Sequence, residues 1–183
     1  MSRIGNRPII VDDDVSISSL ENKVTVKSKK GEIDFDLPEG IYIDISDNLI
    51  RVKKRINNKD IKALHGLSTR IIRNMMIDAK VGYNKILEFK GTGYRAKIDN
   101  GQLVLNMGYS HDILLKVPDN INVIINKNKI IIEGIDRVIV GQFASKIRDV
   151  RPPEVYKGKG IKYESEIIKK KAGKAAQATT GKA

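Results

Sequence analysis

Residues 37–50 of the chain read LPEGIYIDISDNLI, and residues 117–130 read VPDNINVIINKNKI, so one pattern recurs at an offset of 80 residues. In each copy a hydrophobic residue, a proline and an acid lead into an apolar segment, a polar turn at Asn48 or Asn128, and a second apolar segment. Short apolar segments bounded by polar turns are typical of β-strands. Because an internal repeat determines architecture before any single motif does, we predict two copies of one structural unit.

An amphipathic helix is predicted after each copy, because apolar residues recur there at three- and four-residue spacing. Asn57 or Asn58 is a candidate N-cap for the first helix, and Asp136 for the second. Pro152-Pro153 would end the second helix. The residues expected to face the core are Ile61, Leu64, Ile71, Ile72, Met75 and Met76 in the first helix and Ile139, Phe143, Ile147 and Val150 in the second.

Each copy also has a predicted hairpin upstream. The first turns at Lys29-Lys30-Gly31, and the second turns at Asp99-Asn100-Gly101, where the Asn-Gly pair is a strong signal for a two-residue turn. Each half is therefore predicted to hold several antiparallel strands covered by one helix, an α+β fold of two duplicated domains. We place the first domain at residues 1–82, the second at residues 83–168, and a disordered basic tail at residues 169–183.

The composition favours a polyanionic partner. The 183 residues include 34 Lys and Arg against 22 Asp and Glu, a net charge of +12, and no Cys. Such an excess strengthens binding to phosphates, because each contact releases condensed counterions. There is neither an apolar run of the length of a transmembrane helix nor a secretory signal at the start, so we expect a cytoplasmic protein with no membrane partner.

Half of this net charge lies in residues 151–183, which carry nine Lys or Arg and three Glu. In residues 151–163 Lys alternates with Gly between two Tyr. Glycines let a backbone approach phosphates closely, lysines supply charge, and Tyr rings can stack on unpaired bases. A Lys-Gly run by itself fits a flexible solvated loop about equally well. The polarised charge of the chain favours RNA contact.

The same segment carries a family resemblance. Residues 151–163 read RPPEVYKGKGIKY and closely resemble the RPPEPYKGKGIRY signature of bacterial large-subunit ribosomal protein L-six. The opening MSRIG followed by Pro8-Ile9 is similar to that family, as are GTGYRA at 91–96, LNMGYSH at 105–111 and VGQFA at 140–144. Val155 departs from the usual Pro, and Asp12-Asp13-Asp14 from the usual Pro-containing first strand.

The resemblance implies a structural constituent of the large ribosomal subunit with two duplicated α+β domains. It implies binding to 23S rRNA, mainly through the second domain and tail, near the base of the factor-binding stalk and beside other large-subunit ribosomal proteins. No cofactor and no small-molecule substrate are expected. The residues expected to bind rRNA are Arg95, Arg151, Tyr156, Lys157, Gly158, Lys159, Gly160, Lys162, Tyr163, Lys169, Lys170, Lys171 and Lys174.

An enzyme is the first alternative. Gly91-Thr92-Gly93 supplies only two glycines of a dinucleotide-binding loop, and a hairpin rather than a helix is predicted to follow. His65 and His111 are the only histidines, and we expect each at the surface or as a cap. Asp12-Asp13-Asp14 lacks the ligand spacing and turn glycine of a calcium loop. We therefore predict no catalytic site and no metal site.

A non-ribosomal two-domain nucleic-acid-binding regulator is the second alternative. Such a regulator is expected to have a recognition helix with exposed Arg, Asn or Gln. Arg70 and Arg73 of the first predicted helix are candidates for that role. Basic helix faces are more often merely solvated. Preference for assembled rRNA over duplex DNA would separate this class of protein from a ribosomal one.

The aperiodic, charged end generates a testable prediction. Residues after about Lys171 cannot offset their chain entropy by burial, so they should be mobile in the unbound protein and ordered only on RNA. Amide exchange measured by NMR should be fast there without RNA. Sharp, protected amide signals in the unbound protein would contradict this interpretation.

Overall fold

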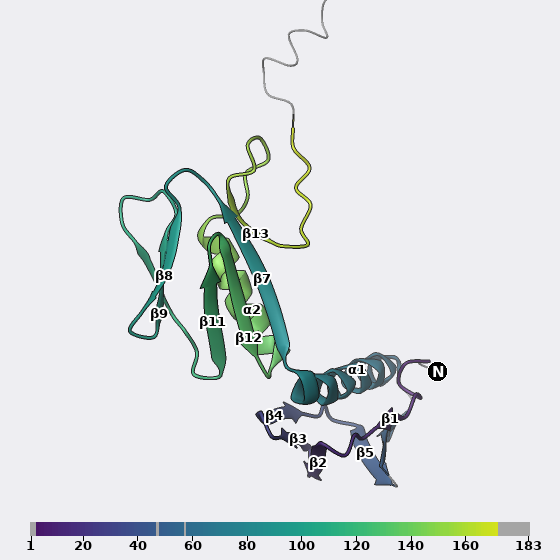
Figure 1. The fold of residues 1–183 in the computed structure, drawn as a ribbon. Helices are drawn as coiled ribbons and strands as arrows, with labels where there is room; N and C mark the ends of the chain where they lie inside the picture. The colour runs from purple at the N-terminus through teal and green to yellow at the C-terminus, as the bar shows by residue number, and fades with distance from the viewer. Residues whose placement is uncertain (1–2, 47, 57, 172–183) are drawn as a thin grey trace, which may run out of the picture. The chain divides into compact units, whose positions relative to one another are not determined.

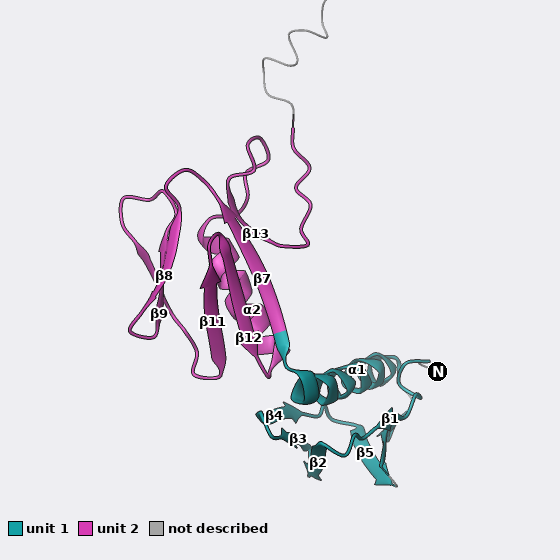
Figure 2. Cartoon of the chain, viewed as in Figure 1, with its two compact units in different colours: residues 1–83 teal, residues 84–183 magenta. Residues whose placement is uncertain are grey.

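The computed structural model describes residues 3–46, 48–56 and 58–171. The chain divides into two compact units, residues 1–83 and residues 84–183 (Figure 2). The boundary expected from the sequence, after residue 82, differs from this division by one residue. Gly82 is the C-cap of the first helix.

The first unit has six strands and one helix within its described residues. They are β1 (Ile9–Ile10), β2 (Val15–Leu20), β3 (Lys23–Ser28), β4 (Gly31–Asp36), β5 (Ile41–Ser46), β6 (Leu49–Lys54) and α1 (Lys59–Val81). The strands form two antiparallel three-stranded sheets, ordered β2-β3-β4 and β1-β6-β5. Helix α1 packs on strands of both sheets.

The second unit repeats this order and adds one strand. Its elements are β7 (Tyr83–Lys90), β8 (Arg95–Asp99), β9 (Gln102–Asn106), β10 (Ile113–Lys116), β11 (Ile121–Asn126), β12 (Lys129–Gly134), α2 (Arg137–Val150) and β13 (Gly160–Tyr163). The sheets are ordered β10-β9-β8 and β11-β12-β7-β13. Figure 1 shows α2 lying along the larger sheet, with β8 and β9 to one side.

The repeat read from the sequence is present in the strands themselves. β5 and β6 span 41–46 and 49–54, and β11 and β12 span 121–126 and 129–134, which is the same pair displaced by 80 residues. The pairing register also repeats, because Ile43 opposes Val52 and Val123 opposes Ile132. The predicted α+β fold with two repeated units is therefore confirmed.

Caps and turns follow the local sequence signals. Asn58 is the N-cap of α1, where its side chain accepts from the Lys59 amide, and Asp136 is the N-cap of α2. Asn100 and Gly101 both have positive φ, at 48° and 73°, as a two-residue hairpin turn between right-handed strands requires. The hairpin expected after Gly91-Thr92-Gly93 is present, so no helix follows these glycines.

The cores are aliphatic, and several of the helix residues expected in them are only partly buried. Ile72, Met75 and Met76 of α1 are buried, whereas Ile61, Leu64 and Ile71 are only partly buried. In α2, Phe143 and Ile147 are buried and Ile139 and Val150 lie at the margin. The strands contribute most of the fully buried side chains, which include Val24, Val26, Ile50, Leu87, Leu103, Leu105, Ile130, Ile132 and Ile161.

The expectation that His65 lies at the surface or caps a helix is wrong. The side chain is 3% exposed, and its Nε2 donates to the Val52 carbonyl on β6 at 2.8 Å. Gly5 packs against the imidazole ring, and the Thr69 hydroxyl donates to the Gly5 carbonyl at 3.4 Å. A buried imidazole needs such a partner. Its partners come from two distant segments, so no local pattern indicated them. His111 is exposed, as expected.

This packing makes the first unit sensitive to a single methyl group. A Cβ at Gly5 would overlap the His65 ring, so Gly5→Ala should destabilise the chain by roughly 1 to 3 kcal/mol through overpacking. Gly141→Ala is the matched control, because its Cβ would meet no atom within 4 Å and Ala favours a helix interior over Gly. Thermal melts should show a lower Tm for Gly5→Ala and an unchanged or higher Tm for Gly141→Ala. Equal Tm values for both variants would contradict the packing account.

Candidate nucleic-acid interface

The basic segment after α2 forms a closed loop. Residue 150 ends the helix, and the chain returns to the sheet at β13. The Glu154 amide donates to the Lys159 carbonyl at 2.8 Å, and the Ile161 amide donates to the Arg151 carbonyl at 2.7 Å. These bonds close the base of the loop and leave Tyr156, which is 55% exposed, near its tip. We call residues 151–160 the basic loop.

Strand β13 fixes this loop to the sheet. Its residues Gly160 to Tyr163 pair antiparallel with Leu87 to Lys90 of β7. Ile161 is fully buried, and β13 also contacts α2. The strand is therefore part of the core of the second unit, and the basic loop starts and ends on rigid structure.

Gly160 is required at the point where the loop joins β13. Its φ is +136°, which disfavours other residues, and a Cβ there would lie 2.6 Å from the Pro152 carbonyl oxygen. The residue is also buried. Its role in this chain is thus close packing against Pro152-Pro153. Gly158, with φ +70°, lies near the loop tip and is only partly buried.

An ion pair clamps the segment that follows β13. The Arg148 guanidinium of α2 donates to both carboxylate oxygens of Glu166, at 3.0 and 2.7 Å, and the Tyr163 amide donates to the same carboxylate at 3.1 Å. The hydrogen bond from Arg148 lowers the pKa of Glu166, with a further lowering from the Tyr163 amide. Both side chains are less than a third exposed, so water screens this pair weakly.

Arg151 is held by aromatic rings. Its guanidinium lies 4.9 Å from the centroid of the Tyr109 ring, and hydrogen bonding to Tyr109, with a contribution from Tyr94, raises the pKa of Arg151. The Tyr109 hydroxyl donates to the Val150 carbonyl at 2.9 Å. Arg151 therefore ties the end of α2 to the loop before β10, and it has a packing role besides the expected RNA contact.

Exposed lysines gather beside the basic loop. Lys157 is exposed and Lys159 partly so, and Lys169, Lys170 and Lys171 are exposed. The Lys171 amide donates to the Val155 carbonyl at 2.9 Å, which brings residues 169–171, assigned above to the tail, alongside the loop. A Cβ at Gly158 would lie 3.3 Å from Cε of Lys170.

Other expected contact residues lie apart from this cluster or are already paired. Lys162 on β13 pairs with Glu88 at 3.2 Å, and Tyr163 lies beneath Lys85, whose Nζ is 5.4 Å from the ring centroid. Arg95 is exposed on β8, in the other sheet of the second unit. Lys174 lies outside the described residues.

Acidic side chains neutralise the first unit more fully. It has 15 Lys and Arg against 12 Asp and Glu, whereas the second unit has 19 against 10. On the β2-β3-β4 sheet Lys23 pairs with Asp34 and Lys27 with Glu32, at 2.8 and 3.0 Å. Asp12 and Asp14 pair with Lys80 and Lys29 rather than gathering around a cation site. The excess charge belongs mostly to the second unit.

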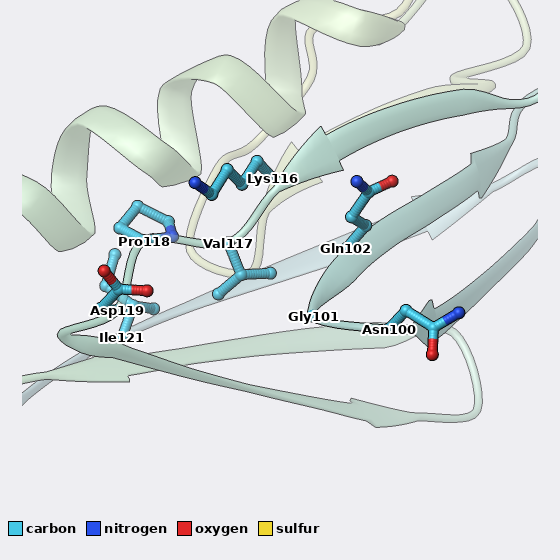
Figure 3. A pocket seen from close by; sticks show the side chains of 8 residues that line it. All are labelled: Asn100, Gly101, Gln102, Lys116, Val117, Pro118, Asp119 and Ile121. Atoms are coloured by element: carbon cyan, nitrogen blue, oxygen red, sulfur yellow. The ribbon is translucent and has the colours of Figure 1, made fainter.

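One open hollow of about 390 Å³ lies between the β8–β9 turn and the segment that joins β10 to β11. Figure 3 shows the lining side chains, among which Lys116 and Asp119 are the charged ones, with no His. Across the part of the chain that the structure describes, no group of three His, Asp or Glu is arranged to hold a metal ion. Within the same residues, neither helix is long and apolar enough to cross a membrane.

Sequence reasoning missed the groups that shape the basic loop. Glu166, Arg148, Glu88 and Tyr109 were not among the expected site residues, although each holds part of the loop or its neighbours in place. The alternation of buried Ile161 with polar Lys162 was the signal available for β13. It was too short to stand out beside the Lys-Gly run.

Fold and surface together define a duplicated α+β protein in which several exposed lysines lie in or beside one loop that is closed at its base. The family model for ribosomal protein L6 matches residues 11–78 and again residues 90–164, once in each unit. The chain therefore belongs to the ribosomal protein L6 family, and the resemblance read from the sequence is confirmed. That family is structural rather than enzymatic, which also confirms the prediction that this chain is not an enzyme.

Curated relatives match along almost the whole chain. The large ribosomal subunit protein uL6c of Porphyra purpurea is 43% identical, over 97% of this chain and 99% of its own length. The large ribosomal subunit protein uL6 of Nostoc sp. is 42% identical over 97% and 98% of the two chains. The protein of the same name from Lachnoclostridium phytofermentans is 44% identical over 97% and 99%.

The Arg148–Glu166 clamp generates a pH prediction. A carboxylate with a lowered folded pKa stabilises the fold above its unfolded pKa and loses that contribution as pH falls through the folded value. At pH 7, Glu166→Gln should cost about 1 to 3 kcal/mol, as expected when a hydrogen bond to a charged group is removed. The difference in unfolding free energy between wild type and variant should stay constant at pH values above 4.5, the ordinary pKa of a Glu side chain. It should shrink as the pH falls below that value.

Glu164→Gln is the control, because Glu164 forms an exposed pair with Lys129 at 2.6 Å. Exposed pairs contribute only about 0 to 1 kcal/mol, so this variant should cost less at pH 7. Urea unfolding at several pH values measures both differences. A Glu166→Gln cost that persisted unchanged to pH 2 would rule out the clamp as its source.

Proposed function

We propose that this chain is a structural constituent of the large ribosomal subunit. It binds 23S rRNA chiefly through its second unit and stabilises the folded rRNA near the base of the factor-binding stalk. The proposal rests first on family membership, since relatives named as large ribosomal subunit proteins align with this chain along nearly their whole length.

The observation that carries the RNA-binding part is the ordered basic loop. It combines exposed Lys157, the backbone of Gly158 and the half-exposed ring of Tyr156 with the neighbouring lysines 169–171. Lysines and backbone amides bind phosphates, and an exposed Tyr ring stacks on a base that has left a helix. Because the loop is closed at its base before RNA arrives, less conformational entropy is lost on binding.

The proposed partners follow from the same assignment. They are 23S rRNA and the other large-subunit ribosomal proteins near the stalk base, and the proposed location is the cytoplasm, within the large subunit. Supporting translation requires no catalytic group from this chain. Its contribution is to hold an rRNA segment in one conformation by neutralising phosphates that otherwise repel one another.

The test is a filter-binding titration of the full chain on 23S rRNA at several salt concentrations. We compare wild type with a variant in which Lys157, Lys159 and Lys170 are replaced by Gln. The log-log salt slope should become shallower by roughly 0.7 to 0.9 for each phosphate that the variant no longer neutralises. Thermal melts should be nearly unchanged, because exposed substitutions usually alter stability by within about 0.5 kcal/mol.

The charge-matched control replaces Lys23, Lys27 and Lys53, each of which already pairs with a carboxylate in the first unit. Its slope should stay close to that of wild type. If the control loses as much affinity and slope as the loop variant, the basic loop is not the main contact. Competition with duplex DNA at equal phosphate concentration should displace little chain, whereas efficient displacement would favour a non-ribosomal regulator.

A further inference from the structure

Helix α1 of the first unit carries a row of cations on its outer surface. Lys59, Lys62, Arg70 and Arg73 are all exposed, and their spacing places them within about 80° of arc on a helix with 3.6 residues per turn. The row extends for about 21 Å along the helix, at 1.5 Å per residue. The buried residues, which include Ile72 and Met76, occupy a different sector of the helix.

Within the described chain, these four cations lack the carboxylate partner that most other lysines of the first unit have. Lys23, Lys27, Lys53 and Lys80 each lie within 3.0 Å of a carboxylate oxygen. Among the described residues, none of the four cations of the α1 row has a carboxylate within salt-bridge distance. Their charge is therefore not used to hold the first unit together.

The duplicated helix shows that the fold does not require this charge. In the second unit, the exposed residues of α2 include Lys146 and Asp149 as its charged members, with the others being Val138, Gln142 and Ser145. Both helices pack on equivalent sheets, yet only α1 has an outer row of cations. Because fold is shared and charge is not, the row points to a ligand rather than to packing.

We propose that the outer face of α1 is a second RNA contact, which binds the phosphate backbone of an rRNA segment through Lys59, Lys62, Arg70 and Arg73. Two guanidinium groups match phosphate oxygens in a bidentate manner, and a row of this length can lie along several phosphates. The exposed large apolar side chains on the same helix near this row, Leu67 and Ile77, are fewer than the four cations, so the face suits a phosphate backbone better than an apolar protein groove. The contact goes beyond the binding proposed for the basic loop.

The consequence is a chain that holds RNA through both units. Two linked contacts bind more tightly than either alone, since the second contact forms intramolecularly. The first unit thereby contributes affinity that is independent of sequence, whereas the basic loop adds a stacking ring.

The test uses the full chain with Lys59, Lys62, Arg70 and Arg73 all replaced by Gln, a residue with similar helix propensity. In the same filter-binding titration on 23S rRNA, the salt slope should become shallower by about 2 to 3, and affinity at fixed salt should fall at least about tenfold. The control replaces Lys23, Lys27, Lys29 and Lys53 by Gln, which removes the same charge from paired positions. Its slope should change by less than about 1.

Four outcomes would overturn this inference. An α1 variant with wild-type slope and affinity, beside a weakened loop variant, would overturn the second contact and leave the basic loop assignment standing. Equal losses in the α1 variant and the control would mean that net charge alone acts. An α1 variant that binds naked rRNA normally but fails to enter large subunits would assign the face to a protein partner. Lack of binding by the wild-type chain would overturn both proposals.

Discussion

The pairing of β13 with β7 is the interaction on which the candidate interface depends. Without it, residues 151–171 would be a charged segment with little apolar content, and such segments stay disordered. With it, Ile161 fills the core beneath α2, and the ion pair between Arg148 and Glu166 holds the chain beyond the strand. The basic loop is therefore ordered by burial at its ends rather than by contacts among its lysines.

The duplicated scaffold explains why charge could be placed differently in the two units. The strand pairs β5–β6 and β11–β12 share register, and β6 and β12 are buried at the same two apolar positions, so the fold depends mainly on such positions. Side chains on the outer surface can be replaced with little effect on stability. In the first unit sheet lysines are paired with acids, while α1 has its row of cations. In the second unit the surplus charge lies around the basic loop.

Much of the fold could be predicted because it is encoded locally. The turn at Asn100-Gly101 and the caps Asn58 and Asp136 are short-range signals. The repeat predicted that the elements they bound form two copies of one unit. Long-range packing was not predictable in the same way. His65 is buried because the Val52 carbonyl and Gly5 meet its ring, and Gly160 is required because Pro152-Pro153 passes close to it. The basic loop itself was found from composition, whereas the residues that hold it, such as Glu166, carry no signature.

On this structure, the basic loop is already ordered by β13 before RNA binds. Hydrogen–deuterium exchange of the unbound chain, resolved to single amides, measures that order. The Ile161 amide, which donates to the Arg151 carbonyl, and the Glu154 amide, which donates to the Lys159 carbonyl, should exchange far more slowly than unstructured amides. The Ile161 amide should be protected nearly as well as the core strands. Exchange of both amides at random-coil rates, with β7 still protected, would contradict the claim.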